Sequence, residues 1–123
     1  MRKQYFFRAS PEGLLAWDVD RLVRLTRDFP VRAVPLAAVR ALDEPVFSDD
    51  EPPTWRSLVA HLRLVDAAEL AYPIILAANG EVMDGRHRLA RALREGRPSI
   101  DAVQFPEDPT PDYVGRQPDE LPY

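Results

Sequence analysis

Cysteine is missing from the 123 residues of this sequence. Its absence excludes a disulfide scaffold, a thiol nucleophile, an iron–sulfur cluster and any zinc site of the cysteine type. Long apolar runs are missing as well: Tyr72–Ala78 is among the longest, whereas a membrane-spanning helix needs roughly 18 to 20 such residues. The first 20 residues carry charges throughout, which argues against a leader peptide. We therefore expect a single cytoplasmic domain with no membrane partner.

A basic excess is also missing, because 20 Asp and Glu residues outnumber 16 Lys and Arg residues. The imbalance is local: residues 106–123 hold five carboxylates against the single Arg116, so the whole net charge of −4 falls there. Residues 1–105 are neutral, and we expect no general electrostatic binding of DNA, which normally shows as a clear basic excess. We expect a domain over residues 1–105 and an acidic, proline-rich C-terminal arm over residues 106–123. Regularly spaced aromatic and aliphatic residues in the arm favour packing over disorder.

The N-terminal part of the domain is predicted to be a helical extension. Apolar residues at helical spacing begin at Leu14, and the pattern is strongest over Asp18–Asp28. Asp18 can cap this helix, and Pro30 would stop it. The next segment, residues 31–36, has the composition of a strand.

The middle of the chain predicts a loop followed by a helix. Residues 37–42 can form one short helical turn. Residues 43–53, rich in proline and acidic side chains, can neither hold a helix nor pair as a central strand. Thr54 is a favoured N-cap for the helix that follows. Asp66 can cap a second short helix over residues 67–71.

The clearest local pattern lies in the C-terminal half of the domain. Residues 73–77 predict a buried strand, Asn79-Gly80 a two-residue type I′ turn, and residues 81–83 the short return strand. A helix is expected over Arg86–Glu95, since a glycine follows it in the usual position past the last turn. Ser99–Phe105 is predicted to be the last strand of the domain.

The segment Asp84–Arg88 falls where a buried strand meets a helix N-terminus. Backbone N–H groups and the positive end of the helix dipole favour an anion there. Gly85 lets a ligand approach the backbone closely, Arg88 can offer a planar fork to phosphate oxygens, and His87 can donate a hydrogen bond or exchange a proton near neutral pH. The segment therefore predicts a phosphate-binding site.

Each of these side chains also has a structural alternative. Asp84 can serve as the helix N-cap, Arg88 can form an ion pair with a surface carboxylate, and His87 can fix the strand–helix turn by a hydrogen bond. The other histidine, His61, is interpreted as structural, because no cysteine or second paired histidine gives it metal-ligand spacing.

A basic run continues along the same helix in Arg91, Arg94 and Arg97. Nucleic-acid binding is one interpretation. An i, i+4 pair between Arg91 and Glu95, with the other two arginines as ordinary cations of a helix C-terminus, is the interpretation that we favour. The two tryptophans are expected to be core or groove-lining residues, and base stacking by either has no independent support.

The run of residues 72–105, centred on Val82–Leu89, resembles the ParB/sulfiredoxin superfamily. Members of that superfamily hold nucleotide phosphates with a Gly-x-x-Arg element at a helix N-terminus. Gly85, His87 and Arg88 match the sulfiredoxin form, Gly-Cys-His-Arg, while Gly85 and Arg88 match the ParB form, Gly-Glu-Arg-Arg. The remainder of the chain is similar to small stand-alone bacterial members without an assigned activity.

The resemblance implies an α+β fold in which a small mixed β-sheet is flanked by helices, and a bound nucleoside triphosphate, ATP or CTP, with Mg²⁺. The chain also departs from the family pattern. Arg86 stands at the position of the sulfiredoxin nucleophile, so reduction of a cysteine sulfinic acid is not expected. The 123 residues leave no room for the helix-turn-helix and dimerisation segments of full-length ParB proteins.

A further branch of the superfamily comprises free-serine kinases with a motif similar to Asp84–Arg88. By that resemblance Asp84 would organise Mg²⁺ or the acceptor, and Glu44, in the acidic loop, would be the catalytic base. Thr54 and Arg56 resemble the phosphate-contacting region that precedes this helix in ParB proteins. The predicted nucleotide-binding residues are therefore Gly85, Arg86, His87, Arg88, Thr54 and Arg56.

Two functions are compatible with these observations. One is a nucleotide-phosphate-binding domain that acts as an ATPase or a small-molecule kinase. The other is a non-enzymatic ParB-like accessory module linked to DNA segregation, which reaches DNA through a partner. A nuclease is a weaker idea, because it would need a cluster of metal-binding carboxylates around Asp84. The preferred base, the acceptor and the presence of a homodimer stay open.

Overall fold

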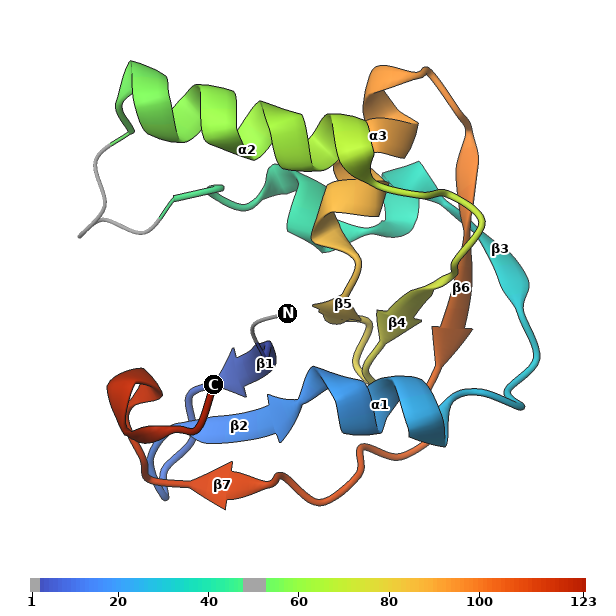
Figure 1. Ribbon diagram of the computed structural model, residues 1–123. Helices are drawn as coiled ribbons and strands as arrows, with labels where there is room; N and C mark the ends of the chain where they lie inside the picture. Colours follow the sequence, from blue (N-terminus) through green and yellow to red (C-terminus); the bar gives the residue numbers. More distant parts are fainter. Residues whose placement is uncertain (1–2, 48–52) are drawn as a thin grey trace.

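The computed structural model describes residues 3–47 and 53–123 of the chain. Within them, three α-helices and two β-sheets form a small mixed structure of α and β elements, as the α+β expectation requires (Figure 1). No helix of the described part is long and apolar enough to cross a membrane.

A four-stranded sheet lies at the centre of the molecule. Its strand order is β3 (Arg32–Pro35), β6 (Ser99–Gln104), β4 (Ile74–Leu76) and β5 (Val82–Asp84). β4 runs parallel to β6, and the other pairs are antiparallel. All of β4 is buried, which explains the unbroken apolar run in its sequence, because a strand covered on both faces needs no polar side.

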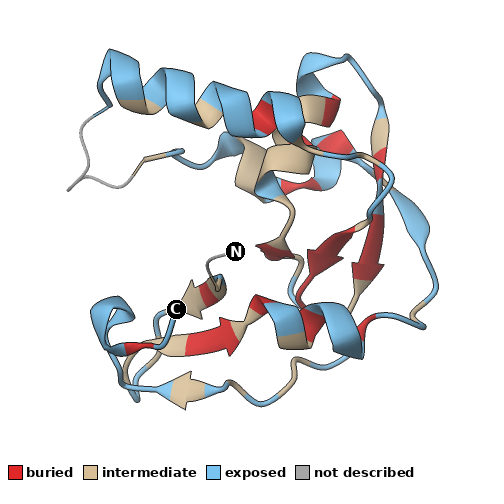
Figure 2. Cartoon of the chain, in the orientation of Figure 1, coloured by how far each residue is buried: buried red, intermediate tan, exposed pale blue. Residues whose placement is uncertain are grey.

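The two faces of this sheet contribute to two different cores. Side chains that alternate along a strand point to opposite faces. Ile74 and Leu76 therefore join the core formed with α3 (Arg86–Arg94) and two short 3-10 turns, whereas Ile75 joins the second core. The sheet is thus covered on both sides (Figure 2).

The second core lies between the central sheet and a three-stranded antiparallel sheet. The small sheet consists of β1 (Tyr5–Arg8), β2 (Leu15–Asp18) and β7 (Tyr113–Val114), and α1 (Val19–Leu25) follows β2 directly. Trp17 and Leu22 are its largest fully buried side chains. Trp17 is therefore a core residue, as expected.

The helical extension predicted for the N-terminus is wrong in its first part. Residues from Leu15 to Asp18 form β2, and β1 precedes it, because β1 and β7 both pair with this segment. The helix itself is confirmed: the carboxylate of Asp18 caps α1 by accepting a hydrogen bond from the amide of Asp20 at 2.9 Å. It is shorter than predicted and ends at Leu25.

The long helix α2 (Trp55–Ala67) packs against the outer side of α3 by its C-terminal end (Figure 1). Thr54 is its N-cap, as predicted, in a capping box with Ser57. Val65 is its one residue classed as buried, and Figure 2 shows the rest of the helix largely exposed. The second short helix predicted after Asp66 is wrong, because Asp66 lies inside α2.

Other elements of the prediction are confirmed with small shifts. The strand and helical turn expected over residues 31–42 are β3 and the two 3-10 turns, Leu36–Ala38 and Arg40–Asp43. The loop expected over residues 43–53 has no regular structure over residues 44–47, and residues 48–52 of it lie outside the described part of the chain.

The predicted hairpin between β4 and β5 is present, but the prediction of a type I′ turn is wrong. That turn needs a positive φ at both central residues, and only Gly80 has one, at 92°. Ala77 instead accepts a hydrogen bond from the amide of Gly80 at 2.9 Å and donates one to the carbonyl of Glu81 at 2.8 Å. This pattern is typical of a three-residue loop in which a left-handed glycine forms a bulge.

The C-terminal arm packs back onto the body, as its apolar residues predict. The indole nitrogen of Trp17 donates to the carbonyl of Pro109 at 2.8 Å. Asp112 accepts a hydrogen bond from the amide of Asp18 at 2.8 Å, and Leu121 is buried. Asp108 lies 2.9 Å from Arg8, so two of the arm's carboxylates are used to hold it in place.

Candidate functional site

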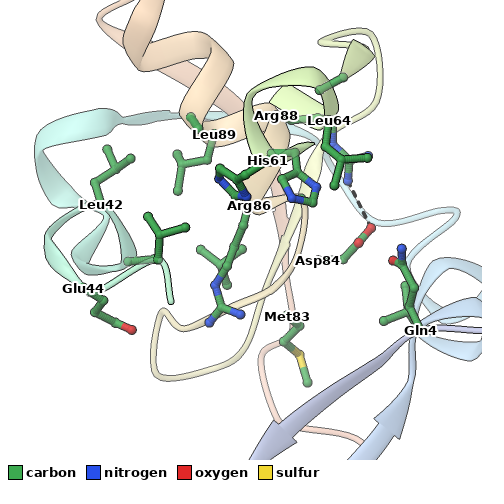
Figure 3. A pocket seen from close by; sticks show the side chains of 18 of the residues that line it. Gln4, Leu42, Glu44, His61, Leu64, Met83, Asp84, Arg86, Arg88 and Leu89 are labelled. Atoms are coloured by element: carbon green, nitrogen blue, oxygen red, sulfur yellow. Dashed lines mark hydrogen bonds and ion pairs between the residues drawn. The ribbon is translucent and has the colours of Figure 1, made fainter. Parts of the chain in front are cut away.

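A pocket of about 1400 Å³ opens between the two helices α2 and α3 and the N-terminal sheet. Its wall comes mainly from the chain before and at the start of β1, the second 3-10 turn with the segment that follows it, the C-terminal half of α2, and the region from β5 through α3. Apolar side chains from three of these segments, including Leu42, Leu64 and Met83, share the pocket with charged ones (Figure 3).

The N-terminus of α3 opens into this pocket at Gly85. This residue is the N-cap with φ 106°, and no side chain caps the helix. A Cβ added to Gly85 would lie 2.6 Å from Cγ2 of Ile74, so both the backbone angle and the space require glycine. The structural alternative in which Asp84 caps the helix is wrong.

Asp84 and Arg88 form an ion pair across the first turn of α3. Nη2 of Arg88 lies 3.0 Å from Oδ2 of Asp84, and it also donates to the carbonyl of Pro73 at 3.3 Å. Each side chain is 19% exposed. Nε of Arg88 is buried without a hydrogen-bond partner in the described part of the chain. Arg88 therefore forms an ion pair with a carboxylate, as its structural alternative predicts.

Arg86, in contrast, makes no ion pair with any described residue and is exposed. Figure 3 shows its side chain reaching from the start of α3 toward the side of the pocket where Glu44 lies, while Arg88 points to Asp84. Glu44 is exposed and lines the same pocket. The structure thus brings the predicted base, Glu44, to the pocket that contains the Asp84–Arg88 segment.

The two histidines of the chain meet in this pocket. The ring centres of His61, on α2, and His87, on α3, are 5.1 Å apart with an interplanar angle of 60°. The ring centre of Phe47 lies 5.9 Å from that of His61. Burial lowers the pKa of His87, and the neighbouring His61 and Arg88 lower it further, against the opposing effect of Asp84.

The interpretation of His61 as structural rested on spacing along the sequence, where no cysteine or second paired histidine accompanies it, and the fold nevertheless places His87 beside it. No local signal in the sequence predicts the pair, because it depends on how α2 packs against α3. The helical position of His61 places it on the inner face of α2 with Leu64 and Val65, but the sequence does not say which element that face meets.

Thr54 and Arg56 do not reach the pocket. The hydroxyl of Thr54 accepts a hydrogen bond from the amide of Ser57 at 3.0 Å, at the N-terminal end of α2. Arg56 lines a separate shallow hollow on α2, together with Trp55, Val59, Ala60 and Arg63. Trp55 is 84% exposed, so it is not a core residue. It lines this hollow, which is the groove-lining alternative.

The basic run of α3 has structural partners. Arg91 pairs with Glu95 at 3.2 Å, Arg97 contacts Glu95 at 3.4 Å, and Arg94 pairs with Asp66 of α2. The predicted i, i+4 pair between Arg91 and Glu95 is therefore confirmed, and the other two arginines also have carboxylate partners.

A magnesium site built by the protein alone is not present in the described residues, where no group of three or more His, Asp or Glu side chains is placed to hold a metal ion. Asp84 is the carboxylate at the helix start, and one of its oxygens is bound by Arg88. Mg²⁺ keeps several waters and is usually held by one or two carboxylates together with substrate phosphates. The residues present therefore fit an ion that arrives with a nucleotide.

Comparison of the chain with protein-family models, with curated proteins and with solved structures finds no significant match.

Proposed function

We propose that this protein binds the phosphate groups of a nucleotide at the N-terminus of α3. One observation carries the proposal: three features line the same pocket of about 1400 Å³. They are a helix start without a side-chain cap, Gly85, whose position accepts no side chain, and Arg86, which has no ion-pair partner among the described residues. Helix N-termini favour anions through their backbone N–H groups and the helix dipole. An unpaired guanidinium adds a planar, permanently charged donor.

The two arginines have different roles in this proposal. Arg86 is free to form a bidentate contact with phosphate oxygens. Arg88 is engaged with Asp84 and with the carbonyl of Pro73, so it is a positioning residue that fixes the strand–helix turn. His87 lies in the first turn of α3 and can donate a hydrogen bond to the same ligand.

The remaining wall of the pocket suits the rest of a nucleotide. Ligand pockets are mostly apolar with a few convergent polar groups. Leu42 and Leu64 provide apolar surface beside the charged helix start, and the buried side chains of Met83 and Leu89 belong to the same wall. A base and a sugar could lie against these side chains while the phosphates occupy the helix N-terminus.

A phosphotransferase or an ATPase would need two further groups. Mg²⁺ bound with the phosphates neutralises the charge that develops during phosphoryl transfer, and the free Oδ1 of Asp84 would be its protein ligand. Glu44 would accept the proton of the attacking hydroxyl or water, since it is the carboxylate on the opposite side of the pocket from Asp84 (Figure 3).

Calorimetric titration of the purified protein with ATP, ADP and CTP, each with and without Mg²⁺, tests the proposal. We expect micromolar binding that weakens at least tenfold in Arg86→Ala. Arg63→Ala is the matched control, because Arg63 is exposed on the outer side of α2, away from the pocket. Absence of binding by all three nucleotides would overturn the proposal, and equal binding by both variants would overturn the role of Arg86.

A second candidate function, an accessory module that binds a protein partner, is favoured by the outer side of α2. Trp55 and Val59 line the hollow on this helix, and Leu58 and Leu62 of the same helix are also exposed. Measurement of phosphate release discriminates between the two functions. An enzyme forms product from ATP or CTP on its own, whereas a module of this kind binds nucleotide or partner without turnover.

A further inference from the structure

The chain has two histidines, and the fold brings both of them to one side of the pocket. They come from different helices, His61 from α2 and His87 from α3, and their ring centres are 5.1 Å apart. Within the described part of the chain, neither imidazole takes part in an ion pair or a side-chain hydrogen bond, so the ring nitrogens are available to a ligand.

We propose that His61 and His87 together bind a borderline transition-metal ion, with Zn²⁺ as the best candidate. Two imidazoles that share one tetrahedral ion, each at a metal–nitrogen distance of about 2.0 to 2.1 Å, have ring centres about 5 Å apart. The observed separation of 5.1 Å agrees with this geometry. The tilt of 60° between the rings is compatible with it, because each ring can rotate about its metal–nitrogen bond.

The chemistry of the donors selects the class of metal. Imidazole nitrogen suits zinc, copper and nickel, whereas Mg²⁺ takes oxygen ligands. The site is thus distinct from any Mg²⁺ that accompanies a nucleotide. A neutral imidazole is the ligating form, and burial, which lowers the pKa of His87, favours that form. Asp84 and Arg88 are the charged groups that act on His87, in addition to His61.

The described residues supply two ligands and no third His, Asp or Glu in ligating position. Both histidines line the pocket, so water or a bound anion would fill the remaining coordination positions. An open site of this kind binds metal less tightly than a closed structural site with four protein ligands. A bound ion would also join α2 to α3, and we expect it to stabilise the packing of α2, which buries little surface of its own.

The test uses the full chain without an affinity tag, because a histidine tag would bind the same metals. Zn²⁺ and Ni²⁺ are titrated calorimetrically in the absence of nucleotide. His61→Phe and His87→Phe retain an aromatic ring and remove the nitrogens, and Glu69→Gln is the control, as Glu69 lines the same pocket. We expect at least a tenfold loss of affinity in each histidine variant, little further loss in the double variant, and no change in Glu69→Gln.

A second measurement needs no variant. One equivalent of Zn²⁺ is expected to shift the ring ¹⁵N resonances of both histidines in the unmodified protein. Binding that is unchanged in the histidine variants, or ring resonances that do not move, would overturn the proposal and leave the pair as an aromatic contact. Since no nucleotide is present, a protein that binds Zn²⁺ but no nucleotide would contradict only the proposed function, and the reverse result would contradict only this inference.

Discussion

Arg88 reaches back along the first turn of α3 to Asp84, and its Nη2 atom lies 3.0 Å from Oδ2 of that carboxylate. The same nitrogen donates to the carbonyl of Pro73, the residue before β4. One side chain thereby joins the start of α3, the end of β5 and the start of β4. The arginine that the phosphate-binding pattern singles out is thus also part of the scaffold.

Removal of Arg88 is expected to destabilise the fold. In Arg88→Met the partly buried carboxylate of Asp84 loses its partner, which costs about 1 to 3 kcal/mol of the free energy of unfolding. Arg86→Met, two residues away at an exposed arginine without an ion-pair partner in residues 3–47 and 53–123, is expected to change it by no more than about 0.5 kcal/mol. Urea denaturation of both variants measures the difference. Equal effects would show that the Asp84–Arg88 pair contributes little.

Gly85 is expected to tolerate no side chain. Gly85→Ala places a Cβ 2.6 Å from Ile74 and 2.9 Å from Nη2 of Arg88 at a φ of 106°. We expect a loss of at least about 2 kcal/mol, from backbone strain and overpacking together.

Gly80→Ala is the matched control for Gly85→Ala. Gly80 also has a positive φ, 92°, but no atom lies within 4 Å of an added Cβ. Only the backbone term remains, about 1 to 2 kcal/mol. Thermal unfolding of the two variants separates the terms, and a larger loss at Gly80 than at Gly85 would contradict the crowding at Ile74.

The pair of Arg8 and Asp108 makes stability depend on pH in the acid range. Burial opposes the charged carboxylate of Asp108, but hydrogen bonds from the amide of Ala78 and from Arg8 lower its pKa below the usual 3.8. The unfolded chain therefore binds more protons in this range, and the stabilisation present above pH 3.8 is lost as the pH falls below it.

Acid unfolding followed by circular dichroism measures this contribution. Asp108→Asn is expected to be less stable at neutral pH and to show a weaker loss on acidification than the unchanged protein. Asp119→Asn, at an exposed position of the same arm, serves as the control. Parallel acid transitions for all three proteins would rule out a contribution from Asp108.

His87 contributes a second dependence on pH, closer to neutrality. Its folded pKa lies below the usual 6.5, chiefly because of burial. As the pH falls, the unfolded state therefore takes up a proton before the folded state does. The contribution of His87 to stability is fully present above pH 6.5 and decreases as the pH falls below it. Denaturation between pH 5 and pH 8 with a metal chelator present checks this expectation, and His87→Phe should flatten the slope. A slope that is unchanged in the variant would contradict it.

The C-terminal half of the domain could be predicted from local signals. The apolar run before Asn79, the two glycines at positions 80 and 85, and the glycine after α3 fix β4, β5 and α3 within a few residues. The N-terminal strands could not be predicted in this way. Trp17 and its neighbours have helical spacing, and they form a strand because β1 and β7 pair with them, the latter from the far end of the sequence.

The candidate site could be predicted where its residues are contiguous in the sequence, but not where they are brought together by packing. The Asp84–Arg88 segment is contiguous, so its position at a helix N-terminus follows from the local pattern. The different partners of its two arginines depend on the positions of Pro73 and the pocket, and the approach of His61 depends on the packing of α2. Thr54 and Arg56 were placed by resemblance alone, and they lie outside the pocket.

The small sheet has a consequence for how the protein is made. It pairs strands from opposite ends of the chain, and Arg8 and Trp17 find their partners only at Asp108 and Pro109. While the chain is being synthesised from its N-terminus, β2 can have β1 beside it, but its other edge stays open until β7 has left the ribosome. The core around Trp17 is therefore completed only near the end of synthesis. In a nascent chain that stalls before residue 108, this core would remain accessible to chaperones and proteases.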